Sequence, residues 1–309
     1  MPGSLSTGMG VNWHHVKALI SARRAGVRFE RVLTVGRLNL FIGPHDLREL
    51  VRALEPELYA RYDQFLAEHP AYAESVYRML GAQEVESIDA SGYENATHVH
   101  DLNAPIPEHL KGRYDFVDDG GTIEHVFHFP QAIRNCMEMV KVGGSLQLHV
   151  PANNMSGHGF YQFSPDLFYR VLSEENGFAV DRMIAYEAFD GSQWYEVADP
   201  KRVKSRIELV SRPLPVLLLV RARRVAADVP IFATTPQQSD YVATWDRGSE
   251  PNARPMVGEA SSGLRAWVKR TVGKISPGML RGVRFKKTAR GSRAHSFAAQ
   301  PQFFKPVEI

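Results

Sequence analysis

A chain of 309 residues with 44% hydrophobic and 23% charged residues can bury a core of normal size, which excludes a largely disordered protein. Its net charge of +3 is small, and its single cysteine, Cys136, excludes an intramolecular disulfide and fits a reducing compartment. Because no apolar run approaches the ~20 residues of a membrane-spanning helix and residues 1–10 do not resemble a signal peptide, we expect a cytoplasmic protein.

The first part of the chain predicts helices around one buried strand. Residues 11–25 have the apolar spacing of a short helix, and the apolar run at residues 32–35 is typical of a buried strand. Helical stretches are expected at residues 46–66 and 73–80, the second of which ends at Gly81 as its C-cap.

Strands and helices alternate in the middle of the chain. Strands are predicted at residues 85–88, 97–100, 114–117, 146–150, 179–186 and 216–223. Helices are predicted at residues 130–141, which Gly143 and Gly144 should end, and at 165–172, which Ser164 should cap. Strands that alternate with helices of this length favour βαβ units, so we expect an α/β fold with a mostly parallel sheet.

Three of these strands end in carboxylates, where ligands of parallel sheets bind. Asp89 follows the second strand and is placed to accept hydrogen bonds from the hydroxyls of a ribose. Asp101 follows the third strand, and Asp118 and Asp119 precede a Gly120–Gly121 pair after the fourth. The alternative for each carboxylate alone is a turn or cap residue.

The segment YDFVDDGGTIEHV at residues 114–126, the helix after it and the Val-Gly-Gly before the next strand resemble class I S-adenosylmethionine-dependent methyltransferases. Their usual pattern is EH…LKPGG, and the resemblance covers residues 29–225. It implies a Rossmann-like, seven-stranded sheet between helices, with an antiparallel final strand. It also implies S-adenosylmethionine as cofactor, with the ribose on Asp89 and the adenine beside Asp101 and Leu102. The cofactor-binding residues expected from it are Gly36, Arg37, Asp89, Asp101, Leu102, Asp119 and Gly120.

The loop after the first strand departs from that family. Its pattern there is an acidic residue followed by Gly-x-Gly-x-Gly, whereas residues 34–43 read TVGRLNLFIG and match only at Gly36. The chain from Gly36 to Asp89 is also much longer than the roughly 20 to 30 residues of a compact βαβ half. An extra helical segment must cover or rebuild this part of the pocket.

The loop PANNMSGHGFYQFSP at residues 151–165 leaves a strand on the ligand side and is rich in polar side chains. We expect His158 or His125 to act as general base on an acceptor, because imidazole titrates near neutral pH. The expected substrate-binding residues are Asn153, Asn154, Tyr161 and Gln162. The alternatives are that His158 is an exposed loop residue and that His125 caps a helix.

Histidines recur between residues 98 and 149, and His98 and His100 fall on one side of a strand. No cysteine pair and no HExxH spacing accompany them, so the sequence predicts no metal site.

The end of the chain is basic. Residues 264–275 have the pattern of a basic amphipathic helix, suited to an anionic membrane surface or to a partner groove. The alternative is a helix folded back on the domain, and no nucleic-acid-binding module is recognisable. We therefore divide the chain into a helical lead-in (1–28), a methyltransferase-like domain (29–225), a linker (226–260) and a basic tail (261–309).

The sequence thus favours methyl transfer from S-adenosylmethionine to a hydroxyl or amine of a small or saccharide acceptor, with glycan biosynthesis as one setting. The alternative is a non-catalytic binding or scaffold protein of the same fold. A nicotinamide-dependent oxidoreductase is disfavoured, because no G-x-G-x-x-G opens a helix after the first strand.

Overall fold

The computed structural model describes residues 10–207, 209, 214–248 and 296–307. The chain forms two compact units. One consists of Met1–Val197, Pro213–Pro236 and Lys305–Ile309, and the other of Ala198–Arg212 and Gln237–Phe304. Every residue of the predicted site lies in the first unit, which is described below.

A single sheet organises this unit, with the strand order β3-β2-β1-β4-β5-β8-β6-β7-β9 among the described residues. The strands are β1 (Arg31–Val35), β2 (Glu84–Asp89), β3 (His98–Val99), β4 (Tyr114–Asp119), β5 (Val140–Asn153), β6 (Phe178–Glu187), β7 (Trp194–Val197), β8 (Val216–Arg224) and β9 (Phe304–Val307). Pairs β1–β2, β1–β4, β2–β3 and β4–β5 are parallel, and β8 is antiparallel to both β5 and β6.

The predicted mostly parallel sheet with a late antiparallel strand is therefore confirmed. The strand count is higher than predicted: nine strands pair where seven were expected, because β7 and β9 extend the edge beyond β6. These two strands are short, which makes them hard to recognise from alternation alone.

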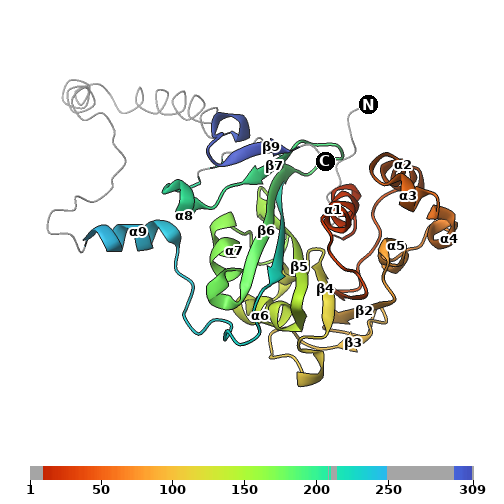
Figure 1. Cartoon of the computed structure of the whole chain (residues 1–309), viewed down its shortest axis with the longest axis horizontal. Coiled ribbons are helices and arrows are strands. Elements are labelled where there is room, and N and C mark those ends of the chain that lie inside the picture. Colours follow the sequence, from red (N-terminus) through yellow and green to blue (C-terminus); the bar gives the residue numbers. More distant parts are fainter. Residues whose placement is uncertain (1–9, 208, 210–213, 249–295, 308–309) are drawn as a thin grey trace. The chain divides into compact units, whose positions relative to one another are not determined.

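Helices cover both faces of the sheet (Figure 1). One layer contains α1 (Trp13–Arg24), α2 (Pro44–Leu54), α3 (Pro56–Tyr59), α4 (Tyr62–Leu66) and α5 (Glu74–Leu80), and the other contains α6 (Phe129–Met139) and α7 (Pro165–Val171). Short 3-10 turns η1 (Glu108–Leu110), η2 (Ile123–His125) and η3 (Glu174–Asn176) lie in the loops. The second unit contains α8 (Pro200–Val203), α9 (Ser239–Gly248) and η4 (Phe297–Ala299).

The loop after β1 explains the long segment that separates it from β2. The amide of Leu40 donates to the carbonyl of Ala71 (2.8 Å), and the amide of Ala73 donates to the carbonyl of Leu38 (3.0 Å). Helices α2, α3 and α4 thus form an insertion whose two ends, residues 38–40 and 71–73, are hydrogen-bonded to each other, and α5 then connects to β2.

Two predicted helix boundaries are wrong. The stretch 46–66 is not one helix, because Pro56 lacks an amide hydrogen and begins α3 after α2 has ended. Gly143 and Gly144 do not stop α6, which ends at Met139, and instead lie within β5. There a side chain on Gly144 would lie 2.8 Å from the carbonyl oxygen of Asp115, so the glycine permits close strand packing.

The expected linker and tail differ in part from the structure. Helix α9 lies within residues 226–260, and β9 adds to the sheet from within residues 261–309. The predicted amphipathic helix at 264–275 lies outside the described residues. None of the described helices combines the length and apolar character needed to cross a membrane.

A buried polar network fixes the α1 and α5 layer to the sheet. Asp118 on β4 accepts hydrogen bonds from His15 Nε2 (2.8 Å), from the hydroxyl of Tyr77 on α5 (2.8 Å) and from Gln147 Nε2 (3.4 Å). His15 Nδ1 lies 3.3 Å from Nδ1 of His149. All these residues are buried, so each depends on the others to replace lost water.

His14, beside this network, makes stability depend on pH. It accepts from Trp194 Nε1 (2.8 Å) and donates to the carbonyl of Phe189 (2.8 Å), which holds the ring neutral. Burial lowers the pKa of His14 from 6.5 to about 4. As the pH falls from 6.5, the unfolded chain therefore takes up a proton before the folded chain does.

Between pH 6.5 and pH 4 the free energy of unfolding should fall by roughly 1.4 kcal/mol per pH unit on account of His14, about 3 kcal/mol in all. Urea unfolding at several pH values measures this slope. His14→Gln should flatten it, whereas substitution of the exposed His45 by glutamine should not. Equal slopes in the two variants would contradict the assignment to His14.

Candidate functional site

The ends of β1, β2 and β4 meet at Gly36. Its amide donates to the carbonyl of Ile88 (2.7 Å), and its φ of +78° favours glycine. A side chain there would lie 2.7 Å from the hydroxyl of Thr122 and 3.9 Å from Oδ2 of Asp89. The other oxygen of Asp89 accepts from the amide of Ser91 (3.2 Å), so Oδ2 is the oxygen that faces the glycine. The structure thus brings Gly36 and Asp89 together, and the contact of Asp89 with a ribose remains a prediction.

Arg37 is held by residues from outside its own loop, on α5 and in the loop after β2. Its Nε donates to Glu74 (2.7 Å), one terminal nitrogen donates to the carbonyl of Glu94 (2.8 Å), and its guanidinium lies 4.0 Å from the ring centre of Tyr72. These contacts occupy the side chain, and its predicted contact with a cofactor remains a prediction.

Leu38 lies against Gly120, a residue that we expected to contact the cofactor. This side chain is 7% exposed, and its methyl carbons would lie 2.9 Å from a side chain on Gly120. The absence of a side chain at Gly120 therefore makes room for Leu38. The predicted contact of Gly120 with a cofactor remains a prediction.

Asp101 and Leu102 lie at the end of β3. Asp101 accepts from both the amide (2.9 Å) and the side chain (2.7 Å) of Asn103, and these hydrogen bonds lower the pKa of its carboxyl. This is the turn role that the sequence left open. Leu102 is buried, and its carbonyl accepts from Asn135 (3.1 Å), so the adenine contacts of both residues remain predictions.

Asp119 lies beneath the turn that follows β4. Its Oδ1 accepts from the amides of Thr122 (3.0 Å) and Ile123 (3.3 Å), while Oδ2 makes no hydrogen bond within the described residues. Burial, and next the charge of Glu124, raise the pKa of Asp119 well above its ordinary value. Asp119 therefore fixes the turn that carries η2.

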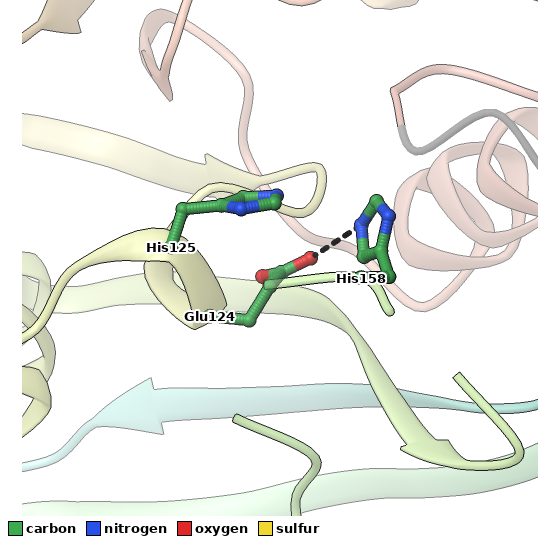
Figure 2. A group of neighbouring side chains, drawn as sticks. All are labelled: Glu124, His125 and His158. Atoms are coloured by element: carbon green, nitrogen blue, oxygen red, sulfur yellow. Dashed lines mark ion pairs between the residues drawn. The ribbon is translucent and has the colours of Figure 1, made fainter. Parts of the chain in front are cut away.

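Glu124, His125 and His158 form a cluster at the ends of β4 and β5 (Figure 2). Glu124 is fully buried, His158 has a side chain that is 29% exposed, and His125 is exposed. Nε2 of His158 lies 3.4 Å from Oε1 of Glu124, and the two imidazole centres lie 4.9 Å apart. One donor atom from each residue lies within 4.8 Å of the others.

The loop after β5 is clamped onto η2, which holds the cluster in place. The amide of Phe160 donates to the carbonyl of Glu124 (2.8 Å), and the hydroxyl of Tyr161 donates to the carbonyl of Phe127 (2.6 Å). A side chain on Gly159 would lie 2.9 Å from both Cγ and the carbonyl oxygen of Glu124. His158 is thereby kept beside the buried carboxylate.

The predicted substrate-binding residues brace the same loop. Asn153 accepts from the amide of Asn154 (3.0 Å), and Asn154 donates to the carbonyl of Leu214 (2.9 Å). Gln162 accepts from the amide of Met155 (2.9 Å). Their contacts with an acceptor, like those of Tyr161, remain predictions.

Two residues of the candidate site are missing from the sequence-based set. Thr122 faces Gly36, and Glu124 joins the two histidines predicted as catalytic. Glu124 could have been found from the sequence, because it directly precedes His125 after a buried strand. The EH pair of the family pattern includes this glutamate, but the sequence analysis gave it no role. For Thr122 the sequence offers no comparable signal.

A pocket of about 490 Å³ lies elsewhere, lined by residues that include Lys111, Gly112, Val142 and Arg224. These residues border the amino-terminal ends of β4 and β5 and the end of β8, opposite the strand ends described above. The pocket is therefore not part of the candidate site.

Solved structures match the chain with low similarity. The branched-chain polyamine synthase of Thermus thermophilus, in complex with N4-aminopropylspermidine and 5'-methylthioadenosine, is 14% identical over 77% of this chain and 65% of its own, with a TM-score of 0.37. The chain thus spans less than two thirds of the length of that enzyme.

Two methyltransferases match similarly. The 1,6-didemethyltoxoflavin-N1-methyltransferase of Burkholderia thailandensis, with bound 1,6-didemethyltoxoflavin and S-adenosylhomocysteine, is 10% identical over 68% of this chain and 78% of its own, with a TM-score of 0.37. The N-methyltransferase NodS of Bradyrhizobium japonicum, in complex with S-adenosyl-L-homocysteine, is 12% identical over 69% of this chain and 87% of its own, with a TM-score of 0.36.

No family model and no curated protein sequence matches the chain. Similarities this low do not indicate an activity. The evidence for the fold is the strand order of the chain itself. The described chain has parallel strands in the order β3-β2-β1-β4-β5, followed by an antiparallel β8 beside β6. On that evidence its fold is class I methyltransferase-like.

Proposed function

We propose that this chain binds S-adenosylmethionine at the carboxyl ends of β1, β2 and β4 and transfers its methyl group to a small acceptor. The observation that carries the proposal is Oδ2 of Asp89 facing the bare backbone of Gly36. The strand order reverses between β1 and β4, and ligands of such sheets bind outside the strand ends at that point. A carboxylate there can accept both hydroxyls of a ribose.

The electrostatics of this edge suit a cationic donor. S-adenosylmethionine carries a positive charge on its sulfonium sulfur. When the methyl group is transferred, this sulfur becomes a neutral thioether. Asp89 and Glu124 stand at or behind the same strand ends, and Glu124 is buried. Buried carboxylates hold a cation more strongly than exposed ones, because less water competes.

The acceptor side of the proposal uses the Glu124 cluster. An acceptor oxygen or nitrogen forms its bond to the methyl group and gives up a proton. In this proposal His158 takes that proton at Nε2, Glu124, which lies 3.4 Å away, stabilises the imidazolium, and His125 is the second candidate base. Two exposed aromatic side chains, Phe127 and Phe160, stand edge to face beside it, with ring centres 6.0 Å apart.

This mixture of polar and apolar groups fits an acceptor with both characters, such as a sugar-like molecule. A hydroxyl or amine acceptor of this kind, and a role in glycan biosynthesis, are the finer parts of the proposal. The polar loop 151–165 supports such an acceptor. Glycan biosynthesis rests on the resemblance of the first loop, TVGRLNLFIG, and of the segment GHGFYQFSP to proteins of surface glycan assembly.

A non-catalytic protein of the same fold is the second candidate. The position of Leu38 against Gly120 favours it, because a bulky side chain stands where the family has glycines. A scaffold would keep the sheet and the turns but would bind no adenosyl ligand.

Titration calorimetry with S-adenosylmethionine and S-adenosylhomocysteine tests the proposal. We expect micromolar binding of both, and a loss of roughly 10- to 100-fold in Asp89→Ala, since hydrogen bonds to a charged group contribute about 1.5–3 kcal/mol. Asp228→Ala, at an exposed position, is the matched control. Binding of neither ligand would favour the scaffold, and equal binding by Asp89→Ala would place the pocket elsewhere.

A further inference from the structure

The Glu124 carboxylate is a buried charge whose hydrogen bonds are missing. Neither of its oxygens makes a hydrogen bond to any described residue, and neither does Nε2 of His158 beside it. Nε2 of His158 lies 3.4 Å from Oε1 of Glu124, close enough for an ion pair, but the two atoms do not form a hydrogen bond. A fully buried carboxylate without a close partner destabilises the folded protein, and a bound cation offsets this loss.

The spacing of the donor atoms matches a shared ion better than a direct contact. Zinc binds histidine nitrogen and carboxylate oxygen at about 2.0–2.2 Å, so two ligands at tetrahedral angles stand roughly 3.4 Å apart. Nε2 of His158 and Oε1 of Glu124 have this separation. His125 supplies a third donor within 4.8 Å, and its exposed ring can rotate to close the remaining gap (Figure 2).

Two other histidine–carboxylate pairs of the first unit show the contrast. His15 lies 2.8 Å from Asp118, whose oxygens also receive hydrogen bonds from Tyr77 and Gln147. Glu86, the partner of His98, accepts from Arg113 and Tyr114 as well. In both pairs the carboxylate is satisfied by protein donors, which leaves no role for an ion.

We propose that Glu124, His125 and His158 bind one divalent transition-metal ion, in a two-histidine, one-carboxylate site. Imidazole nitrogens favour zinc and its neighbours in the first transition series over magnesium and calcium, which prefer oxygen ligands. Three protein ligands leave at least one coordination position open, as catalytic sites do and structural sites do not.

The protein supports the site through its backbone. The hydrogen bond from Phe160 to the carbonyl of Glu124 and the close approach of Gly159 fix the position of His158 before an ion binds. Because ligands held in this way need little rearrangement, the site is arranged in advance for binding.

The open position gives the ion a chemical role, and this consequence rests on the proposed methyl transfer. A divalent ion that binds an acceptor hydroxyl lowers its pKa and makes it a better nucleophile. The acceptor would give its proton to solvent water and form its bond to the methyl group as the methyl–sulfur bond breaks and the sulfonium becomes a neutral thioether. His158 would then be a ligand and not the general base described above.

Calorimetric titration of the full-length protein with Zn²⁺, after removal of metals by a chelator, tests the site without any cofactor. We expect one saturable site, and visible absorption of tetrahedral type when Co²⁺ replaces Zn²⁺. Loss of a partner outside the ligand shell already weakens metal sites about 10- to 100-fold, so loss of a ligand should cost at least ~100-fold. Glu124→Gln and His158→Ala should therefore show that loss.

His128→Ala is the matched control, because His128 is exposed and only three positions from His125 but outside the cluster. It should bind Zn²⁺ like the unsubstituted protein. Absence of a saturable site, or equal affinity in Glu124→Gln and His128→Ala, would overturn the metal site. Cofactor binding is measured separately through Asp89, so the failure of one proposal is distinguishable from the failure of the other.

Discussion

Substitution of Asp118 by alanine should lower the free energy of unfolding by about 3–5 kcal/mol, because three buried donors, on His15, Tyr77 and Gln147, lose their acceptor at roughly 1–3 kcal/mol each. Asp118 and His15 are both fully buried and lie 2.8 Å apart. The hydroxyl of Tyr77 also loses its acceptor, and water cannot replace it there. Since α1 and α5 reach β4 through this carboxylate, the loss should also loosen that helical layer.

Urea unfolding followed by circular dichroism measures this effect. Asp118→Asn, which keeps one acceptor oxygen and the side-chain volume, should cost less than alanine. Asp181→Ala, at an exposed strand position, should change stability by less than about 0.5 kcal/mol. A similarly small change in Asp118→Ala would mean that the network does not hold the helices to the sheet.

Elements with strong local patterns could be predicted from the sequence. Strands β6 and β8 were predicted within two residues of their bounds, because β8 begins with the buried apolar run 216–220 and the second half of β6, residues 183–186, is apolar and buried. The same holds for α5, where Gly81 adopts a φ of +115° as the predicted C-cap. The juxtaposition of Gly36 and Asp89 also followed, because parallel strands end at one edge.

Features that depend on distant residues could not be predicted. The Asp118 network joins residues from positions 15, 77, 118 and 147, and no local period connects them. Likewise, the course of residues 37–42 depends on hydrogen bonds to Ala71 and Ala73, which lie beyond three inserted helices.

The candidate cluster shows the same division. Both histidines were proposed from the sequence as bases, since each stands after a strand that ends at the ligand edge. Their convergence on Glu124 depends on how loop 153–163 folds over η2, and that follows from backbone contacts. The sequence-based prediction of no metal site rested on the absence of familiar spacings. It did not consider ligands brought together from two different loops.

Alanine at Gly159 should weaken Zn²⁺ binding by about 100-fold, as much as the loss of a ligand, although Gly159 itself donates no ligand atom. Its φ of +74° strains any other residue, and the new methyl group would lie 2.9 Å from the carbonyl oxygen of Glu124. That oxygen already accepts from Phe160, so the loop must move away, and His158 moves with it.

Gly157 provides the matched control within the same loop, two residues earlier. A side chain there meets nothing within 4 Å, and its φ lies outside the left-handed region, so Gly157→Ala should bind Zn²⁺ normally. It should also be as stable as the unsubstituted protein or slightly more so, because alanine reduces the freedom of the unfolded chain by about 0.4–1 kcal/mol. Parallel titrations of the two variants separate a specific clamp on Glu124 from a general intolerance of the loop to substitution. Equal Zn²⁺ affinity in both would mean that the contact of Gly159 with Glu124 does not hold His158 in the site. A loss in both would point to the flexibility of the loop, rather than its contact with η2, as the property that binding requires.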